Sequence, residues 1–131
     1  MVGAVTVELT TTNVLAALEA VVAERGADWV YPDEWRDDGV CRYVVDGCPA
    51  CIVGAALAHL GVPVDVLAVF ETSAAMLTYE LGELGHVHKD DDQWATAALV
   101  RAQFVQDGSP PDRPPGTWGE ALVAARAAVP S

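Results

Sequence analysis

The sequence predicts a mainly α-helical single domain of five or six helices, with a short β element before the central helix. Hydrophobic residues make up 52% of the 131 residues, which is enough apolar surface for one core. Most of the chain places apolar residues at helical spacing between capping residues, whereas one short segment is rich in β-branched and aromatic residues. We therefore expect helices to dominate one domain over residues 1–131.

The first helix is predicted after Thr12 or Asn13, either of which can cap it. Gly26 is a typical C-terminal stop. Apolar residues recur on one face of this segment, namely at Val14, Leu15, Leu18, Val21 and Val22. Beyond Gly26, Trp29–Pro32 is predicted to be extended, and the polar stretch Asp33–Gly39 to be a surface loop with Trp35 at its tip.

The β element is predicted over Val40–Asp46, where the turn signal Asp46-Gly47 closes a short strand. Pro49 suits the first turn of the next helix, because its missing N–H is no loss there, and Gly61 ends that helix. The residues between them are nearly all apolar or small, which predicts a buried central helix.

Two further helices are predicted in the middle of the chain. Asp65 can cap a short one over Val66–Phe70, and Thr72 or Ser73 can cap the next one. A long helix then follows the acidic run Asp90–Asp92, whose carboxylates favour a helix N-terminus.

The proline-rich residues 109–116 predict an extended connector after this long helix ends at Gly108. A capping box, Thr117 to Glu120, opens the last helix. This helix is too short to be stable alone in water, so we expect it to dock on the core.

The charge excludes some classes of function. Nineteen acidic residues against seven basic ones give a net charge of −12, which argues against direct binding to nucleic acid or to an anionic membrane. Carboxylates on one face can instead imitate phosphates and occupy a basic site on another protein, or can simply keep the protein soluble. Without a signal-peptide pattern or a long apolar run, we expect a cytoplasmic protein whose three cysteines are reduced.

The cysteines suggest three chemistries. Cys48 and Cys51 have the spacing of a redox pair, although the chain lacks the alternating strands and helices of a thioredoxin-like sheet. Cys51 with His86 or His88 is a possible nucleophile and base, although no phosphate loop, nucleophile elbow or carboxylate pair accompanies them. Zinc would be held by Cys48, Cys51, His86 and His88 with Cys41 as a spare ligand, although one residue separates the histidines instead of roughly three to five. Cysteine is also a common core residue.

A partner-binding surface is predicted in the acidic loop, because aromatic anchors rimmed by charge are typical of interface hot spots. The alternative is that Trp35 folds back on the core. The candidate residues are Asp33, Glu34, Trp35, Asp37 and Asp38.

The segment Cys41-x-Tyr-Val-x-Asp-Gly-x-Pro-x-Cys51-x-Val-Gly54 resembles small uncharacterised proteins encoded by actinobacteria and especially by their phages. The resemblance spans residues 12–127 and implies a helix, a loop and then a central helix. It assigns no catalytic residue, and Cys48 is not part of its pattern. Further residues that carry it are Leu57, Leu60-Gly-Val62, Ala102-Gln103, Gln106-Asp107-Gly108 and Trp118-Gly-Glu-Ala-Leu122.

We therefore expect a noncatalytic acidic interaction protein without a cofactor, such as a phage factor that binds a host protein. The alternative is a thiol or zinc site built on Cys41, Cys48 and Cys51 with His86 and His88.

Overall fold

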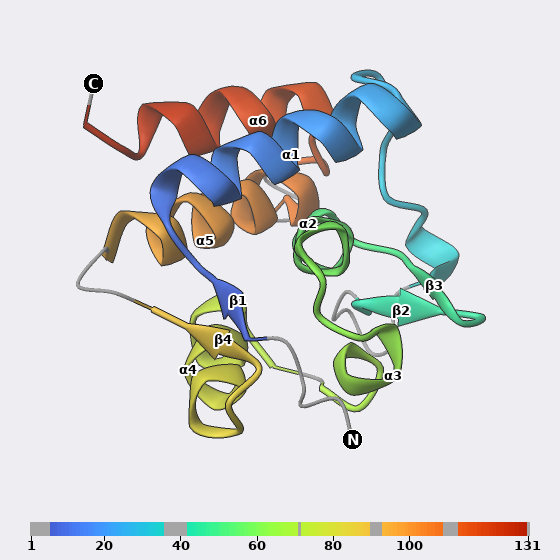
Figure 1. The fold of residues 1–131 in the computed structure, drawn as a ribbon. Coiled ribbons are helices and arrows are strands. Elements are labelled where there is room, and N and C mark those ends of the chain that lie inside the picture. The colour runs from blue at the N-terminus through green and yellow to red at the C-terminus, as the bar shows by residue number, and fades with distance from the viewer. Residues whose placement is uncertain (1–5, 36–41, 71, 90–92, 109–112, 131) are drawn as a thin grey trace.

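The computed structural model describes residues 6–35, 42–70, 72–89, 93–108 and 113–130. It confirms a mainly α-helical fold with a short strand before the central helix (Figure 1). The helices in these ranges are α1 (Thr11–Arg25), α2 (Ile52–Leu60), α3 (Val64–Leu67), α4 (Ala74–Glu83), α5 (Gln93–Asp107) and α6 (Trp118–Ala127), with a 3₁₀ turn at Asp33–Trp35. The strands are β1 (Val7–Glu8), β2 (Val44–Val45), β3 (Cys48–Pro49) and β4 (Val87–His88).

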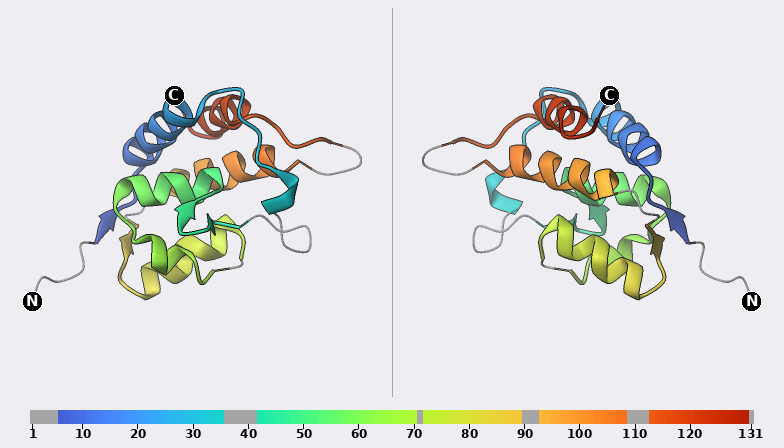
Figure 2. Two further views of the ribbon diagram at one scale, coloured as in Figure 1. Left: turned by 90° about the vertical axis from the view of Figure 1, so that its right-hand side faces the viewer. Right: turned by 90° about the vertical axis from the view of Figure 1, so that its left-hand side faces the viewer.

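The helices stack in three layers. Figures 1 and 2 show α1 beside α6 in one outer layer, α2 and α5 in the middle, and α3 and α4 in the other outer layer. The last helix docks on the core as expected, because α6 packs against both α5 and α1. An ion pair of 3.0 Å between Arg126 and Glu19 also joins α6 to α1.

The strands form two small sheets. β1 and β4 pair in parallel, with Val7 opposite Val87. β2 and β3 form an antiparallel hairpin closed by Asp46 and Gly47, whose φ angles of 52° and 77° are those that a two-residue hairpin turn requires. The turn was predicted from Asp-Gly, but the second strand was not.

Pro49 was predicted in the first turn of the central helix, and this is wrong. Pro49 lies in β3 opposite Val44, and α2 begins three residues later at Ile52 with Cys51 as its N-cap. The tight turn returns the chain directly into a second strand, and a proline fits there because a short strand at the edge of a sheet tolerates a missing donor.

The start of α1 also differs from the prediction. Thr10 is the N-cap instead of Thr12 or Asn13, and its hydroxyl accepts a hydrogen bond of 3.1 Å from the backbone N–H of Asn13. Asp65 lies inside the first turn of α3 rather than at its cap. Of the two caps offered for α4, Thr72 and Ser73, the structure has Ser73, and the capping box of Thr117 with Glu120 is confirmed.

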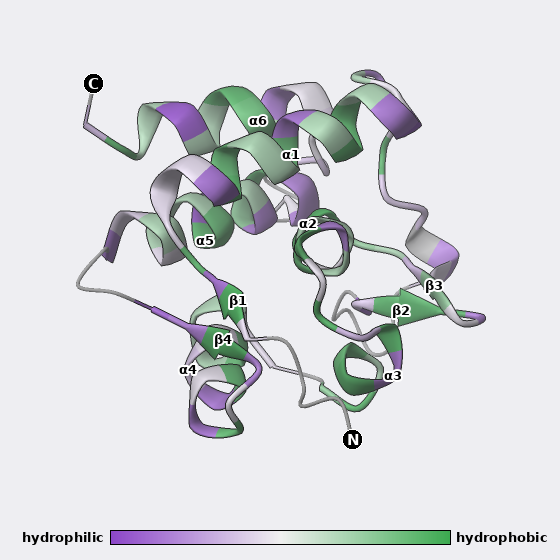
Figure 3. Cartoon of the chain, viewed as in Figure 1, coloured by the Kyte–Doolittle hydropathy of each residue, from purple (hydrophilic) through white to green (hydrophobic). Residues whose placement is uncertain are grey.

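The core lies between the layers and receives residues from every helix. Six consecutive residues of α2, 52–57, are buried, and α2, which Figure 3 shows end-on, is mostly hydrophobic, as expected of a central helix. The buried side chains in the described ranges include two polar ones, Thr78 and Gln106. No helix in these ranges is long and apolar enough to cross a membrane.

Candidate functional site

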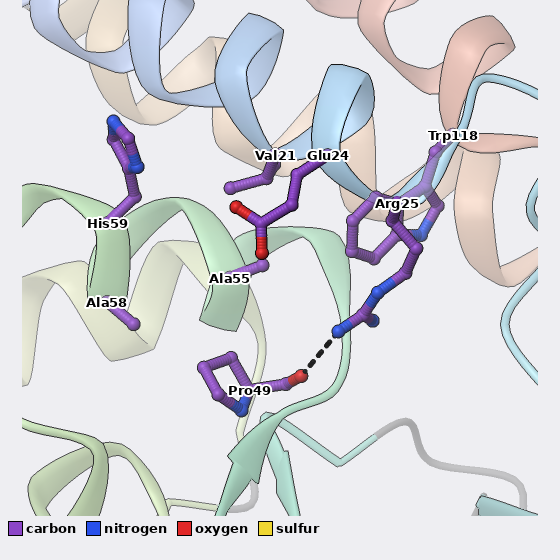
Figure 4. Close-up of a pocket in the computed structure, with 8 residues that line it drawn as sticks. All are labelled: Val21, Glu24, Arg25, Pro49, Ala55, Ala58, His59 and Trp118. Atoms are coloured by element: carbon purple, nitrogen blue, oxygen red, sulfur yellow. Dashed lines mark hydrogen bonds between the residues drawn. The ribbon is translucent and has the colours of Figure 1, made fainter.

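A pocket of about 250 Å³ lies between α1, α2, β3 and the start of α6 (Figure 4). Two alanines of α2, Ala55 and Ala58, leave space beneath α1, and Pro49 extends the apolar floor. The eight residues that line the pocket are Val21, Glu24, Arg25, Pro49, Ala55, Ala58, His59 and Trp118.

Arg25 forms one wall of the pocket from the last turn of α1. Its guanidinium donates hydrogen bonds of 2.8 Å to the carbonyl of Ala50 and 3.0 Å to the carbonyl of Pro49. The guanidinium carbon also lies 4.6 Å from the ring centre of Trp29 and 4.7 Å from that of Trp118. Arg25 therefore ties α1 to the segment before α2 and to α6, by carbonyl bonds and by stacking on two indoles.

The electrostatics of Arg25 follow from this position. Burial lowers the pKa of the Arg25 guanidinium, because the charged form loses solvation, while the negative charge of Glu24 opposes that shift. The ordinary pKa of an arginine side chain lies so far above neutral pH that Arg25 stays protonated despite this shift. The pocket therefore contains a permanent positive charge that is already engaged by two carbonyls.

The indole of Trp118 forms the neighbouring wall and is fixed from below by Gln106. The indole N–H donates a hydrogen bond of 3.1 Å to the side-chain oxygen of Gln106, which also accepts a 2.7 Å bond from the backbone N–H of Ile52. Sequence reasoning missed this role. The available signal is that Gln106 falls on the apolar stripe of its helix, seven residues after the buried Leu99 and four residues after the buried Ala102.

Glu24 and His59 contribute exposed polar groups to the lining of the pocket. They come from facing helices, α1 and α2, and both side chains are exposed. Figure 4 shows the Glu24 carboxylate extending down toward Ala55, between His59 and Arg25. A group bound on the apolar floor would therefore meet this carboxylate.

Trp35 is the last residue of the 3₁₀ turn Asp33–Trp35. It is half-buried, and its ring centre lies 5.8 Å from that of Trp29 and 5.7 Å from that of Tyr31. Its carbonyl also accepts a hydrogen bond from the Tyr31 hydroxyl. Of the two alternatives for Trp35, the contacts match the one in which it folds back on the core. Glu34 beside it is exposed.

The rest of the predicted acidic surface lies outside the described residues. This applies to Asp37, Asp38 and the side chain of Asp33. The rings of Trp29 and Trp118 are 4.7 Å apart in an edge-to-face arrangement, so one aromatic cluster runs from Trp35 to the wall of the pocket.

The two described cysteines have different environments. Cys51 is fully buried, and its sulfur accepts a hydrogen bond of 3.3 Å from the backbone N–H of Gly54 as the cap of α2. Cys48 is exposed on β3. Because side chains alternate along an extended segment, an odd separation places the two thiols on opposite sides of the chain. Cys41 lies outside the described residues.

The two histidines predicted as zinc ligands lie in the other sheet. His88 on β4 pairs with Glu8 of β1 at 2.8 Å, and His86 directly precedes β4. Figure 1 shows this sheet on the opposite side of the domain from β3. In the part of the chain that the structure describes, no group of three or more His, Cys, Asp or Glu side chains is arranged to hold a metal ion.

Comparison with known proteins assigns no family to this chain, since no protein-family model, no curated protein and no solved structure matches it. The size of the pocket is more informative. Sites for drug-sized ligands have volumes of roughly 300–1,000 Å³. A pocket of about 250 Å³ fits one large side chain or a small fragment better than a dinucleotide or another large cofactor.

Proposed function

We propose that this protein is a noncatalytic binding module that recognises a basic partner protein. Its contact surface is the pocket together with the described start of the acidic loop, and we call this the pocket–loop face. It comprises the pocket residues with Trp29, Glu34 and Trp35, while the buried rings of Tyr31 and Trp118 support this surface from the core. The observation that carries the proposal is the aromatic cluster that joins the pocket wall, Trp118, through Trp29 to Trp35.

Aromatic side chains support a protein partner more than a small ligand. Interface hot spots combine rigid aromatic groups with a surrounding polar rim, and a pocket sized for one side chain suits an anchor residue of the partner. Here Trp29 and Trp35 are half-buried at the surface, so each keeps some area for contact. Exposed Glu24 and Glu34 contribute to a charged rim.

Catalysis has less support from the same residues. The Cys51 thiol is buried and serves as a helix cap, whereas the two histidines considered as its base belong to the β4 segment. The Arg25 guanidinium donates to the carbonyls of Pro49 and Ala50 instead of being directed at a site for an anionic substrate.

Charge favours a basic partner. A net charge of −12 steers positively charged proteins toward this one and disfavours acidic ones. In the setting that the resemblance to phage-encoded proteins implies, the partner would be a host protein and binding would take place in the host cytoplasm.

A cross-linking experiment tests this proposal, because Cys48 is an exposed thiol next to Pro49 of the pocket. A benzophenone maleimide attached to Cys48 in a Cys41→Ser background should capture one basic protein from a lysate of the host. The matched control carries Cys48→Ser and Met76→Cys, which moves the probe to an exposed position on α4. The proposal would be contradicted if both probes captured the same protein, or if the probe at Cys48 captured no protein.

A further inference from the structure

We infer that the pocket receives a lysine side chain of the partner, with its ammonium group on the carboxylate of Glu24. This inference rests on the proposed function and specifies the chemistry of the partner at the pocket. Three features support it: the apolar floor of the pocket, the hydrogen bonds of Arg25 to two backbone carbonyls, and the Glu24 carboxylate that extends toward Ala55.

The floor of the pocket suits the four methylene groups of a lysine. Val21, Pro49, Ala55 and Ala58 present only carbon atoms from their side chains. Long cationic side chains bury their stems along such surfaces while the charged end remains at the solvent. The pocket is open to solvent, so the ammonium can keep part of its hydration.

Of the two charged walls, Glu24 is the one placed to contact a ligand, because the Arg25 guanidinium is already held by protein groups. A carboxylate ligand binds arginine through two parallel N–H groups, but the two terminal nitrogens of Arg25 already donate to the Pro49 and Ala50 carbonyls. The Glu24 carboxylate is exposed and extends over Ala55, so it is placed to accept hydrogen bonds from a bound ammonium.

Lysine also fits better than arginine. An incoming guanidinium gains most when it stacks on an aromatic face, and the Trp118 ring already carries the guanidinium of Arg25 at 4.7 Å. A compact ammonium requires no aromatic face, because it acts as a point charge with three donors.

Two small probes test the inference without the partner. Nα-acetyl-lysine N-methylamide and its norleucine counterpart share the stem and differ in the ammonium, and each is titrated into ¹⁵N-labelled protein. We expect the lysine probe to shift the amide signals of Ala55, Ala58 and His59 with a millimolar dissociation constant. The norleucine probe should bind about two- to fivefold more weakly, the range of one exposed ion pair.

Glu24→Gln should reduce lysine-probe binding to the norleucine level while leaving the rest of the amide spectrum unchanged. Asp65→Asn removes the same charge from an exposed residue of α3 and should have no effect. Equal binding of the two probes, no shifts at the pocket, or an unchanged constant for Glu24→Gln would overturn the inference. If cross-linking from Cys48 still succeeds in that case, the proposed function stands and only the lysine assignment fails.

Discussion

The side-chain oxygen of Gln106 accepts a hydrogen bond of 2.7 Å from the backbone N–H of Ile52, so α5 provides an acceptor for the first residue of α2. The same oxygen accepts the indole N–H of Trp118 at 3.1 Å. One buried atom therefore fixes the start of the central helix and one wall of the pocket. Gln103 does the same for α4, since its side-chain oxygen accepts a 2.9 Å bond from the backbone N–H of Ala74.

Replacing Gln106 with leucine should destabilise the fold strongly. The leucine keeps the volume approximately but leaves the N–H groups of Ile52 and Trp118 buried without an acceptor. Each such group costs about 1–3 kcal/mol, so we expect a loss of about 2–5 kcal/mol in the free energy of unfolding. Urea denaturation followed by tryptophan fluorescence measures this loss.

The control for that variant is Gln93→Leu, at an exposed position of α5. A surface substitution of this kind should change stability by at most about 0.5 kcal/mol. If Gln106→Leu were as stable as Gln93→Leu, the double acceptor role of Gln106 would be refuted.

Replacing a glycine with alanine should change the stability of the fold in opposite directions at two helical positions. A Cβ at Gly54 would lie 2.4 Å from the backbone oxygen of Tyr43, so α2 and β2 would have to separate. At Gly82 in α4 the nearest such atom is 3.9 Å away. We expect Gly54→Ala to cost about 2–3 kcal/mol through overpacking, and Gly82→Ala to gain about 0.5–1 kcal/mol because alanine favours a helix. Thermal unfolding of both variants measures these changes. A Gly54→Ala protein as stable as the wild type would contradict the close approach of Gly54 to the backbone of Tyr43.

Glu120 should contribute to the acid sensitivity of the fold. Its carboxylate accepts the backbone N–H of Thr117, which lowers the pKa of Glu120 below its ordinary value of 4.5. Since the folded pKa is the lower one, the contribution is complete above the ordinary pKa and is lost as the pH falls through the folded value. Glu120→Gln should therefore lose less stability than the wild type between neutral pH and the region below pH 4.5.

The control for this pH dependence is Glu34→Gln, which removes an exposed carboxylate outside the capping box. Its stability should fall with acid as that of the wild type does. Parallel curves for Glu120→Gln and the wild type would show that the capping box does not depend on the charge of Glu120.

A native mass spectrum of protein purified without chelators addresses the zinc alternative. Because Cys51 caps α2 from inside the core and Cys48 lies outside, we expect the native mass under reducing conditions to equal the denatured mass. An excess of one zinc per chain would establish a metal site and would redirect attention to Cys41, Cys48 and the histidines. Cys51→Ser would then be expected to lose the metal with the fold retained.

Local signals predicted much of the helical framework. Ser73 and the pair Thr117 and Glu120 mark helix starts through bonds within one turn, so the sequence alone reveals them. The strand that contains Pro49 was not predicted, because the Asp46-Gly47 turn before it was interpreted as the end of the β element and not as the turn of a hairpin. The cap of α1 was misplaced within a run of threonines, each of which is a suitable cap by itself.

The site was less predictable than the fold. Arg25, Gln106 and Trp118 meet through contacts between segments that are far apart in the chain, and no local pattern encodes such contacts. The position of Trp35 was left between two alternatives, because an aromatic residue beside acidic ones suits an exposed anchor as well as a core contact. In the structure, the rings of Trp29 and Tyr31 pack against that of Trp35.

The most direct test of the pocket–loop face is the dissociation constant of the cross-linked partner for two tryptophan variants. His59→Trp places a bulky ring at an exposed position of the pocket, whereas Met76→Trp places the same ring on α4, away from the pocket residues. We predict that His59→Trp weakens binding by about tenfold or more, as loss of an interface hot spot does, and that Met76→Trp binds as the wild type does. Wild-type affinity in His59→Trp, or an equal loss in both variants, would contradict the account.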